Sequence, residues 1–215
     1  IDTLWEDRKF IAIVAAIVTF FGIFYAVVAK PYYEATMTVQ VEDANNPAAV
    51  ERIYDIKGRP HNSPILVLVR DMTCLAELVS EIPPGAVPLM EAFWPGGITI
   101  VFNAGDRVSD RLTGGSGKIG VRIPKHPVAA AIVAELGSSL TGTSANLSGR
   151  EGCWDVSCLD PVLSARIDGV VDAGPLKGGR GSTVIDVTTD PPSILREGTI
   201  SESRIRSVLE KYYAI

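Results

Sequence analysis

Short apolar runs alternate with helical segments from residue 44 to the C-terminus. Compact runs of aliphatic and β-branched residues predict strands, whereas an apolar residue at every third or fourth position predicts a helix. Strands or short extended segments are expected at 64–69, 98–104, 118–123, 138–144, 169–173, 182–187 and 193–197. Helices are expected at 47–57, 72–82, 87–93, 126–136, 160–167 and 201–213. This alternation predicts an α/β fold, a twisted mixed sheet of at least five strands with flanking helices.

The helix expected at 47–57 has clear signals at both ends. Asn46 and Pro47 form an N-cap and first-position pair, because an asparagine side chain accepts from free backbone N–H groups and proline lacks one. Apolar residues then repeat at helical spacing up to Gly58, which is expected to end the helix.

A different pattern occupies the N-terminus, where residues 10–29 carry no charge between Lys9 and Lys30. A helix of that length covers about 30 Å, the thickness of a hydrocarbon core. A signal peptide is disfavoured because no small-residue cleavage pattern follows, and a core helix because such helices seldom stay apolar on all sides. We therefore expect one transmembrane helix at 10–29. The chain opens on Ile1 instead of methionine, so we also expect residues to precede it.

The composition of the chain mainly excludes other classes of protein and of site. Of 215 residues, 47% are hydrophobic and 21% charged, which is typical of a globular protein that buries a full core. The net charge of −5 gives no broad basic surface for non-specific nucleic-acid binding. Cys74, Cys153 and Cys158 form neither a disulfide framework nor the paired C-x-x-C pattern of a zinc site, and so predict a reducing compartment.

Several motifs of known chemistry are incomplete. In LTGGSGKIG, Leu112 and Ile119 stand where a Walker loop requires glycine and a hydroxyl residue, so we expect only a mobile loop. GPLKGGRGSTV does not match G-x-G-x-x-G and precedes a strand. The carboxylates are scattered, and spacing alone places neither histidine in a catalytic triad. No protein metal site is predicted.

Two polar stretches remain as candidate chemistry. Lys57 and Arg59 directly precede the strand expected at 64–69, and they either decorate the surface or clamp an anion. TGTSANLSG, residues 141–149, presents several small donors and acceptors between an apolar stretch and glycines. Such groups suit close approach to the phosphates or ribose of a nucleotide, and they also suit turn formation.

The N-terminal stretches IDTLWEDRKF and KPYYEATMTVQVE, with the apolar span between them, resemble the start of Wzz-type polysaccharide chain-length determinants. In that family a first membrane helix leads into a periplasmic domain through K-P-x-Y-x-A-x-x-x-V. The resemblance covers residues 1–43 and implies membrane contact through 10–29. The family's long helical domain and second membrane helix are not found in this sequence.

Residues 44–215 resemble the YrdC family of threonylcarbamoyl-AMP synthases. Six separated segments carry the resemblance, in the family's order: AVERIYDIKGRP, FWPGGITIVF, KIGVRIPKHP, GTSANLSG, GRGSTVIDVT and ILREGTIS. The family's K-x-R, followed far downstream by S-x-N, is present as Lys57, Arg59, Ser144 and Asn146. The resemblance implies a single YrdC-like domain over 44–215.

That resemblance implies a nucleotidyltransferase that joins L-threonine, bicarbonate and ATP into threonylcarbamoyl-AMP and pyrophosphate, for t6A37 modification of tRNA. It implies an ATP site formed by Lys57, Arg59, Lys118, Ser144, Asn146 and Arg196. Of these, Lys57, Arg59, Ser144 and Asn146 would be catalytic. Arg122 and Ser182 would hold L-threonine. Fixed cations would neutralise the departing pyrophosphate, with Mg²⁺ assisting.

One family motif is absent. Family members carry P-T-[DE]-T-x-Y-G-L before the segment equivalent to 43–60, and its threonine and tyrosine help form the threonine pocket. Here EATMTVQVE stands in that place. We expect a sheet without its first strand unless 36–42 substitutes for it, and an enzyme weakened by the change.

The two resemblances imply different locations. A Wzz-like N-terminus would put the following domain outside the cytoplasm, where ATP and tRNA are absent. We expect the YrdC-like domain to be cytoplasmic, and membrane-associated if the N-terminal segment is genuine. A fused or misassembled reading frame joined near Asp43 explains both signatures.

Three classes of function stay open. The first is the synthase, with tRNA and threonylcarbamoyl-transfer proteins as partners, and it predicts pyrophosphate release that depends on ATP and threonine. The second is a nucleotide- or RNA-binding module without turnover, which loss of the threonine pocket would allow. The third is a membrane-anchored fragment of a polysaccharide chain-length protein.

Overall fold

The computed structural model describes residues 44, 46–176 and 180–213. The transmembrane helix predicted at 10–29, the Wzz-like segment 1–43 and the substitute strand at 36–42 all lie outside the described residues. Within the described ranges, no helix has both the length and the apolar character needed to cross a membrane.

A six-stranded mixed sheet forms the centre of the described fold, in the order β4-β1-β3-β2-β5-β6. The strands are β1 Leu66–Leu68, β2 Ile98–Asn103, β3 Lys118–Arg122, β4 Leu140–Gly142, β5 Thr183–Asp186 and β6 Ser193–Arg196. β1 runs parallel to β3 and β2 parallel to β5, whereas the other neighbouring pairs are antiparallel. The prediction of a mixed α/β sheet with flanking helices is confirmed.

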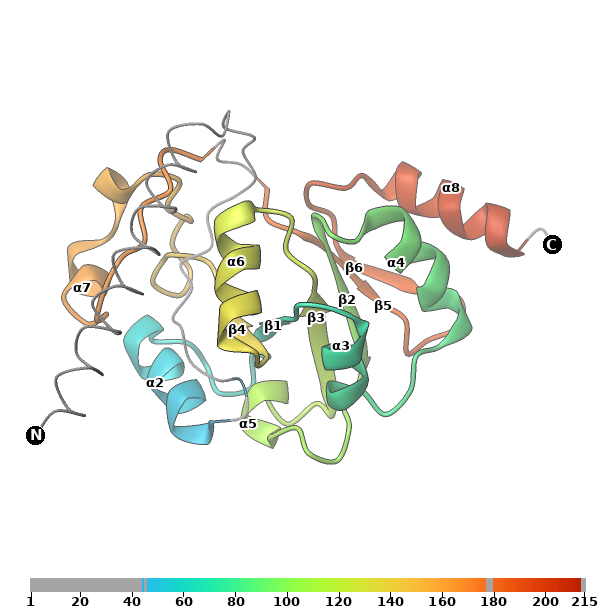
Figure 1. Cartoon of the computed structure of the whole chain (residues 1–215), viewed down its shortest axis with the longest axis horizontal. Helices are drawn as coiled ribbons and strands as arrows, with labels where there is room; N and C mark the ends of the chain where they lie inside the picture. Colours follow the sequence, from blue (N-terminus) through green and yellow to red (C-terminus); the bar gives the residue numbers. More distant parts are fainter. Residues whose placement is uncertain (1–43, 45, 177–179, 214–215) are drawn as a thin grey trace, which may run out of the picture. The chain divides into compact units, whose positions relative to one another are not determined.

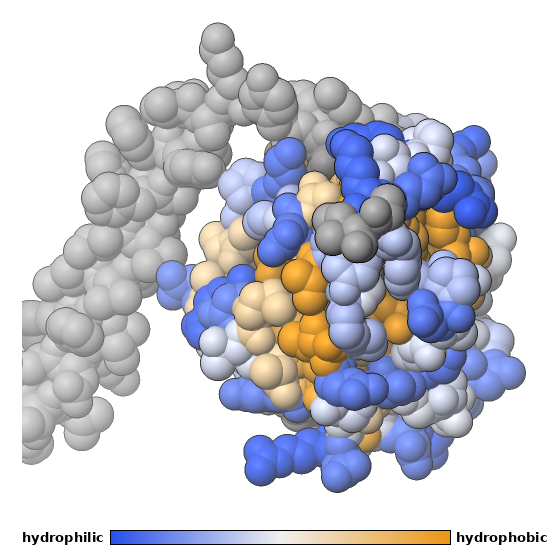
Figure 2. All heavy atoms as spheres, turned by 90° about the vertical axis from the view of Figure 1, so that its right-hand side faces the viewer, coloured by the Kyte–Doolittle hydropathy of each residue, from blue (hydrophilic) through white to orange (hydrophobic). Residues whose placement is uncertain are grey.

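The helices lie on both faces of this sheet and at its ends (Figure 1). They are α2 Pro47–Lys57, α3 Met72–Leu78, α4 Val87–Phe93, α5 Asp110–Thr113, α6 Pro127–Leu136, α7 Pro161–Ser164 and α8 Glu202–Tyr213. Two 3₁₀ segments, Pro84–Ala86 and Val156–Cys158, complete the set. α4 packs against α8 beside β5 and β6, and Figure 2 shows hydrophobic residues reaching the surface among hydrophilic ones on that side.

The two faces of the sheet differ in character because side chains alternate along each strand. One face is apolar: Ile119 and Val121 of β3 and Ile100 of β2 are fully buried in the main core, together with residues of α2, α3, α4, α5 and α8. On the β1–β4 side, α6 covers the other face, where Val133 packs against Leu68.

The remaining part of that second face carries polar residues. We call it the polar face, and define it by five residues of β2, β3 and β5: Thr99, Lys118, Gly120, Arg122 and Asp186. The alternation that buries Ile119 and Val121 on the apolar face therefore turns the cations of β3 toward the polar face.

Helix α2 ends where the sequence predicts. The Asn46 side chain accepts a hydrogen bond from the Ala48 N–H over 3.1 Å, and Gly58 ends the helix in a left-handed conformation with φ of 59°. The Gly58 N–H donates to the carbonyls of Asp55 and Tyr54. The positions of Lys57 and Arg59, on either side of this cap, are thereby fixed.

Several predicted elements are wrong in extent or in kind. The helix expected at 160–167 covers only Pro161–Ser164, and the strands expected at 64–69 and 138–144 cover only Leu66–Leu68 and Leu140–Gly142. The helix expected at 72–82 ends at Leu78, because Val79 is extended and forms a β-bridge with Ala104. The strand expected at 169–173 is irregular, and Val170 and Val171 are 46% and 67% exposed. An apolar run forms a strand only where it can pair with a neighbouring strand, and among the described residues this segment pairs with none.

Candidate active site

Lys57 joins the end of α2 to the loop that follows β4. Its ammonium donates to the Ser144 carbonyl over 2.5 Å, to the Asn146 carbonyl, and to the Asn146 side-chain oxygen over 3.4 Å. In return, the Ser148 N–H donates to the Lys57 carbonyl over 2.9 Å. Two segments almost ninety residues apart in sequence therefore form one hydrogen-bonded unit.

The ammonium group of Lys57 is buried, and the residue is only 5% exposed. Burial lowers the pKa of Lys57 to about 8, and the nearby charge of Arg59 lowers it further in the same direction. An ammonium has three N–H donors. All three have acceptors within the 144–146 loop, so this cation positions the loop.

Arg59 stands two residues beyond, at the entrance to β1. Its guanidinium donates to the Pro64 carbonyl over 2.8 Å and to the Ser63 carbonyl over 3.3 Å. Burial lowers the pKa of Arg59, Tyr54 opposes this shift, and the positive charge of Arg196 adds to it. The positive charge of Arg196 thus affects the pKa of Arg59. These two cations, from the end and the start of the domain, therefore lie in the same region.

Arg196 is held by Ser182. The Arg196 guanidinium donates to the Ser182 carbonyl over 2.8 and 3.3 Å and approaches the Ser182 hydroxyl at 3.4 Å. That hydroxyl also bonds the Thr99 hydroxyl over 2.7 Å, and both residues are buried. A residue predicted to bind ATP and one predicted to bind threonine therefore share one polar cluster.

Arg122 belongs to the same end of the sheet. Its Nε donates to the Gly96 carbonyl over 2.6 Å. The pairing of Val121 with Ile100 puts Arg122 beside Thr99 in the antiparallel β2–β3 ladder. Arg122 and Ser182 thus approach Thr99 from the two strands that flank β2.

Lys118, which the family resemblance assigns to the ATP site, pairs with a carboxylate. Its ammonium forms an ion pair with Asp186 over 2.8 Å. Burial alone would raise the pKa of Asp186, but hydrogen bonds from Lys118 and Thr188 hold it below its ordinary value. Lys118 lies at the opposite end of β3 from Arg122, about 13 Å away along the strand.

Sequence reasoning did not identify Thr99 or Asp186 as site residues. For Thr99 a signal exists, because it is a hydroxyl residue inside the apolar run ITIVF. For Asp186 the strand itself gives no such signal, since its partner Lys118 is 68 residues away. Among the described residues, no three His, Cys, Asp or Glu side chains gather in a way that could hold a metal ion.

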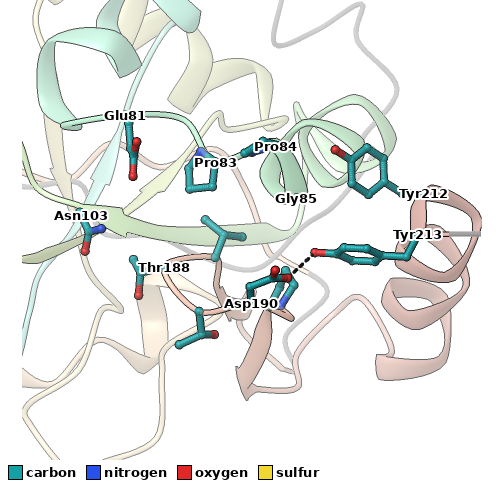
Figure 3. Close-up of a pocket in the computed structure, with 12 residues that line it drawn as sticks. Glu81, Pro83, Pro84, Gly85, Asn103, Thr188, Asp190, Tyr212 and Tyr213 are labelled. Carbon is teal, nitrogen blue, oxygen red and sulfur yellow. Dashed lines mark hydrogen bonds between the residues drawn. The ribbon is translucent and has the colours of Figure 1, made fainter. Parts of the chain in front are cut away.

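A cavity of about 280 Å³ lies between the β5–β6 turn and the end of α8 (Figure 3). Its lining includes Asn103, which pairs with Lys118, and Thr188, which bonds Asp186. Its walls include Pro83, Pro84, Asp190, Tyr212 and Tyr213, and the Tyr213 hydroxyl donates to Asp190 over 3.0 Å. None of the predicted site residues is among those that line it.

Comparisons with known proteins agree with the resemblance of residues 44–215 to the YrdC family. A family model described as Sua5_yciO_yrdC, telomere recombination, matches residues 36–198. A threonylcarbamoyl-AMP synthase of Bacillus subtilis is 38% identical over 168 residues, covering 78% of this chain and 49% of that protein. The structure of P. abyssi Sua5 complexed with L-threonine has a TM-score of 0.75 and 32% identity, over 80% of this chain and 52% of that chain. E. coli YciO has a TM-score of 0.68 and 27% identity, over 78% and 82%.

The fold and the site together define an α/β protein with a cluster of fixed cations beside a polar sheet face. Since the family match covers most of its length, the chain belongs to the Sua5/YciO/YrdC family. The match begins at residue 36, before the boundary expected at 44. The chain spans about half the length of the B. subtilis relative and of the P. abyssi protein.

Proposed function

We propose that this chain forms threonylcarbamoyl-AMP and pyrophosphate from L-threonine, bicarbonate and ATP. One observation carries the proposal: Lys57 holds the Ser144–Asn146 loop, while Arg59 and Arg196 act on the same region. The name of the B. subtilis relative and the L-threonine bound to P. abyssi Sua5 support it.

The nucleotide would lie against the cations and the 144–146 loop. Arg59 and Arg196 neutralise the polyphosphate, because guanidinium groups present paired donors to phosphate oxygens. The Ser144 hydroxyl donates to the Asn146 side-chain oxygen and the Asn146 amide to the Arg150 carbonyl, so these groups would have to exchange loop partners for nucleotide contacts. A phosphate that reaches Lys57 must displace one of its three loop acceptors, since all three donors are in use.

Threonine would lie beside the nucleotide, at the end of the sheet that carries Arg122 and Ser182. Arg122 offers a guanidinium for the carboxylate, and Ser182 offers a hydroxyl beside it. The threonine amine attacks the carbon of bicarbonate-derived CO₂ and loses a proton, which gives a carbamate. A carbamate oxygen then attacks the α-phosphorus of ATP, a new P–O bond forms, and the bond to pyrophosphate breaks. Positioning and charge neutralisation by the fixed cations supply most of the catalysis.

Mg²⁺ would accompany ATP instead of occupying a protein cage. The described residues offer no cluster of three acidic, histidine or cysteine ligands. Mg²⁺ prefers phosphate oxygens and water with at most one or two carboxylates, so it needs no such cluster. We assign no step to it. The product's use in t6A37 formation, with tRNA and transfer proteins as partners in the cytoplasm, is part of the same proposal.

A binding module without turnover is the second candidate, and the absence of P-T-x-T-x-Y-G-L from the sequence favours it. The full chain, incubated with ATP, bicarbonate and labelled threonine, distinguishes the two. The synthase yields labelled adenylate and threonine-dependent pyrophosphate, which Arg59→Ala reduces at least tenfold. The control is Arg206→Ala on α8, an exposed cation that pairs with Glu202 of the same helix. ATP binding without the adenylate would establish the binding module, and absence of ATP binding would refute both.

A further inference from the structure

Cys153 and Cys158 lie together in the loop between β4 and α7, although their sequence spacing fits no known framework. Their sulfur atoms are 2.6 Å apart. Both sulfurs also contact the Asp155 carbonyl, over 2.6 Å from Cys153 and 2.9 Å from Cys158. The turn that Asp155 caps therefore brings the two thiols into direct contact.

The two thiols have unequal environments. Cys153 is 9% exposed, and burial raises the pKa of its thiol. Cys158 is exposed, and a hydrogen bond from Cys153 lowers the pKa of its thiol, with further help from the backbone N–H groups of Asp155 and Trp154. The Asp155 carboxylate opposes this shift. An exposed thiol of lowered pKa in contact with a buried thiol is the arrangement of an oxidisable cysteine and its resolving partner.

This pair is hydrogen-bonded to the candidate active site. The Cys153 N–H donates to the Ala145 carbonyl over 3.3 Å, and Ala145 lies between the two residues that Lys57 holds. The Asn146 amide donates to the Arg150 carbonyl over 2.5 Å. Residues 144–153 thus form one connected segment that runs from the Lys57 ammonium to the first cysteine.

We propose that Cys153 and Cys158 form a reversible disulfide that weakens nucleotide binding at the 144–146 loop. A peroxide oxidises the Cys158 thiolate to a sulfenic acid and leaves as hydroxide. The Cys153 sulfur then attacks the Cys158 sulfur, an S–S bond forms, and the sulfenic oxygen departs as water with the Cys153 proton. A dithiol restores both cysteines by thiol–disulfide exchange and is itself oxidised.

Nucleotide binding is weakened because the loop must move to receive a phosphate. All three Lys57 donors are occupied by Ser144 and Asn146, so a phosphate reaches this cation only if the loop shifts. A covalent ring over 153–158 stiffens the segment bonded to Ala145 and opposes that shift. The effect depends on the nucleotide site proposed above, whereas formation of the disulfide does not.

The test uses the full chain treated with hydrogen peroxide and then with dithiothreitol. Peptide mass mapping is expected to find a Cys153–Cys158 linkage with loss of two hydrogen atoms. Backbone amides of residues 144–150 are expected to exchange more slowly in the oxidised chain. ATP affinity is expected to fall roughly fivefold or more, a typical coupling between linked sites, and to recover on reduction. Cys158→Ser should abolish all three changes, whereas Cys74→Ala, which alters a buried cysteine outside this loop, should keep them.

Specific outcomes overturn the proposal. Over-oxidation of Cys158 without the linkage would show that Cys153 does not resolve the sulfenic acid. A linkage that leaves both amide exchange and ATP affinity unchanged would show that the pair is not coupled to the loop. Slower amide exchange in a chain that binds no ATP in either state would confirm the coupling while refuting the proposed nucleotide site.

Discussion

Lys57 is only 5% exposed, and the burial of its charge makes the free energy of unfolding depend on pH. Its folded pKa of about 8 lies below the value of 10.5 expected for an unfolded lysine. Between these values the unfolded chain binds more protons, so the free energy of unfolding rises with pH. Relative to Lys57→Met, the wild-type chain should gain about 1–2 kcal/mol from pH 7 to pH 9.5. Urea denaturation of both proteins across this range measures the difference.

The comparison with Lys57→Met isolates this residue, because every other titrating group is present in both proteins. The substitution also leaves the Ser144 and Asn146 carbonyls without their donor, which lowers stability at every pH by about 1–3 kcal/mol. Parallel curves for the two proteins would contradict a lowered pKa at this site.

Ser182 tests the assignment of the threonine end of the site. Ser182→Ala removes the hydroxyl but keeps the carbonyl that holds Arg196 over 2.8 Å. We expect the KM for threonine to rise roughly tenfold, the effect of one lost hydrogen bond to a charged ligand, while the KM for ATP stays within about twofold. Steady-state pyrophosphate release with each substrate varied in turn measures this.

Thr99→Val is the matched control for that variant, since it removes the hydroxyl that bonds Ser182 without changing the volume at residue 99. It should raise the KM for threonine much less than Ser182→Ala does. Equal increases in both KM values for Ser182→Ala would instead indicate that the serine acts only by positioning Arg196.

For individual residues, the sequence identifies which pairs lie together in the fold but not which atoms they contact. Lys57 and Asn146 are picked out by family spacing, and the structure joins them by hydrogen bonds. That Lys57 donates to two backbone carbonyls of this loop could not be predicted, because these acceptors depend on the path of the loop. The same holds for Cys153 and Cys158, which a tight turn at Asp155 brings into contact.

At the scale of elements, the end of α2 determines the positions of Lys57 and Arg59. Its last residue is Lys57, and Gly58 ends it in a left-handed conformation with φ of 59°. Gly58→Ala should lower the free energy of unfolding by about 1 kcal/mol, from backbone strain alone, because a Cβ there meets nothing within 4 Å. Gly58→Asn should be less harmful, since asparagine tolerates this conformation. Urea denaturation ranks the two variants.

The control for this series is Gly169→Ala, at an exposed glycine that is not left-handed and also has open space around it. Its stability should stay within about 0.5 kcal/mol of wild type. If Gly58→Ala matched it, the C-cap would not constrain α2. Loss of ATP affinity in Gly58→Ala would further indicate that the C-cap orients Lys57 and Arg59.

Element boundaries could be predicted where local chemistry sets them and not where tertiary contacts do. Asn46 and Gly58 mark α2 correctly. By contrast, α3 ends at Leu78 because Val79 pairs with Ala104 and the Leu78 carbonyl accepts from Gly105, contacts that no local pattern reveals. The valines at 170 and 171 form no strand, since no strand of the described ranges pairs with them.

At the scale of the whole described fold, the class follows from the sequence but the strand order does not. Alternating strands and helices predict an α/β sheet. The order β4-β1-β3-β2-β5-β6 places β3 between β1 and β2, an insertion that depends on long-range packing. This insertion matters for function, because it sets Arg122 of β3 beside Thr99 of β2 and close to the strand that follows Ser182.

The polar face of the sheet can be tested as a unit through Gly120. This residue lies between the two cations of β3, and a Cβ on it would approach the Thr99 methyl at 3.2 Å and a Val101 methyl at 3.9 Å. A larger side chain would extend over the polar face and occupy the space that the proposed substrates need. Gly120→Leu should therefore reduce binding of both ATP and threonine at least tenfold, as measured by titration calorimetry, with a native circular dichroism spectrum. Gly169→Leu, at an exposed glycine with open surroundings, should bind both ligands as wild type does. Normal binding by Gly120→Leu would show that the ligands do not lie over the centre of β3.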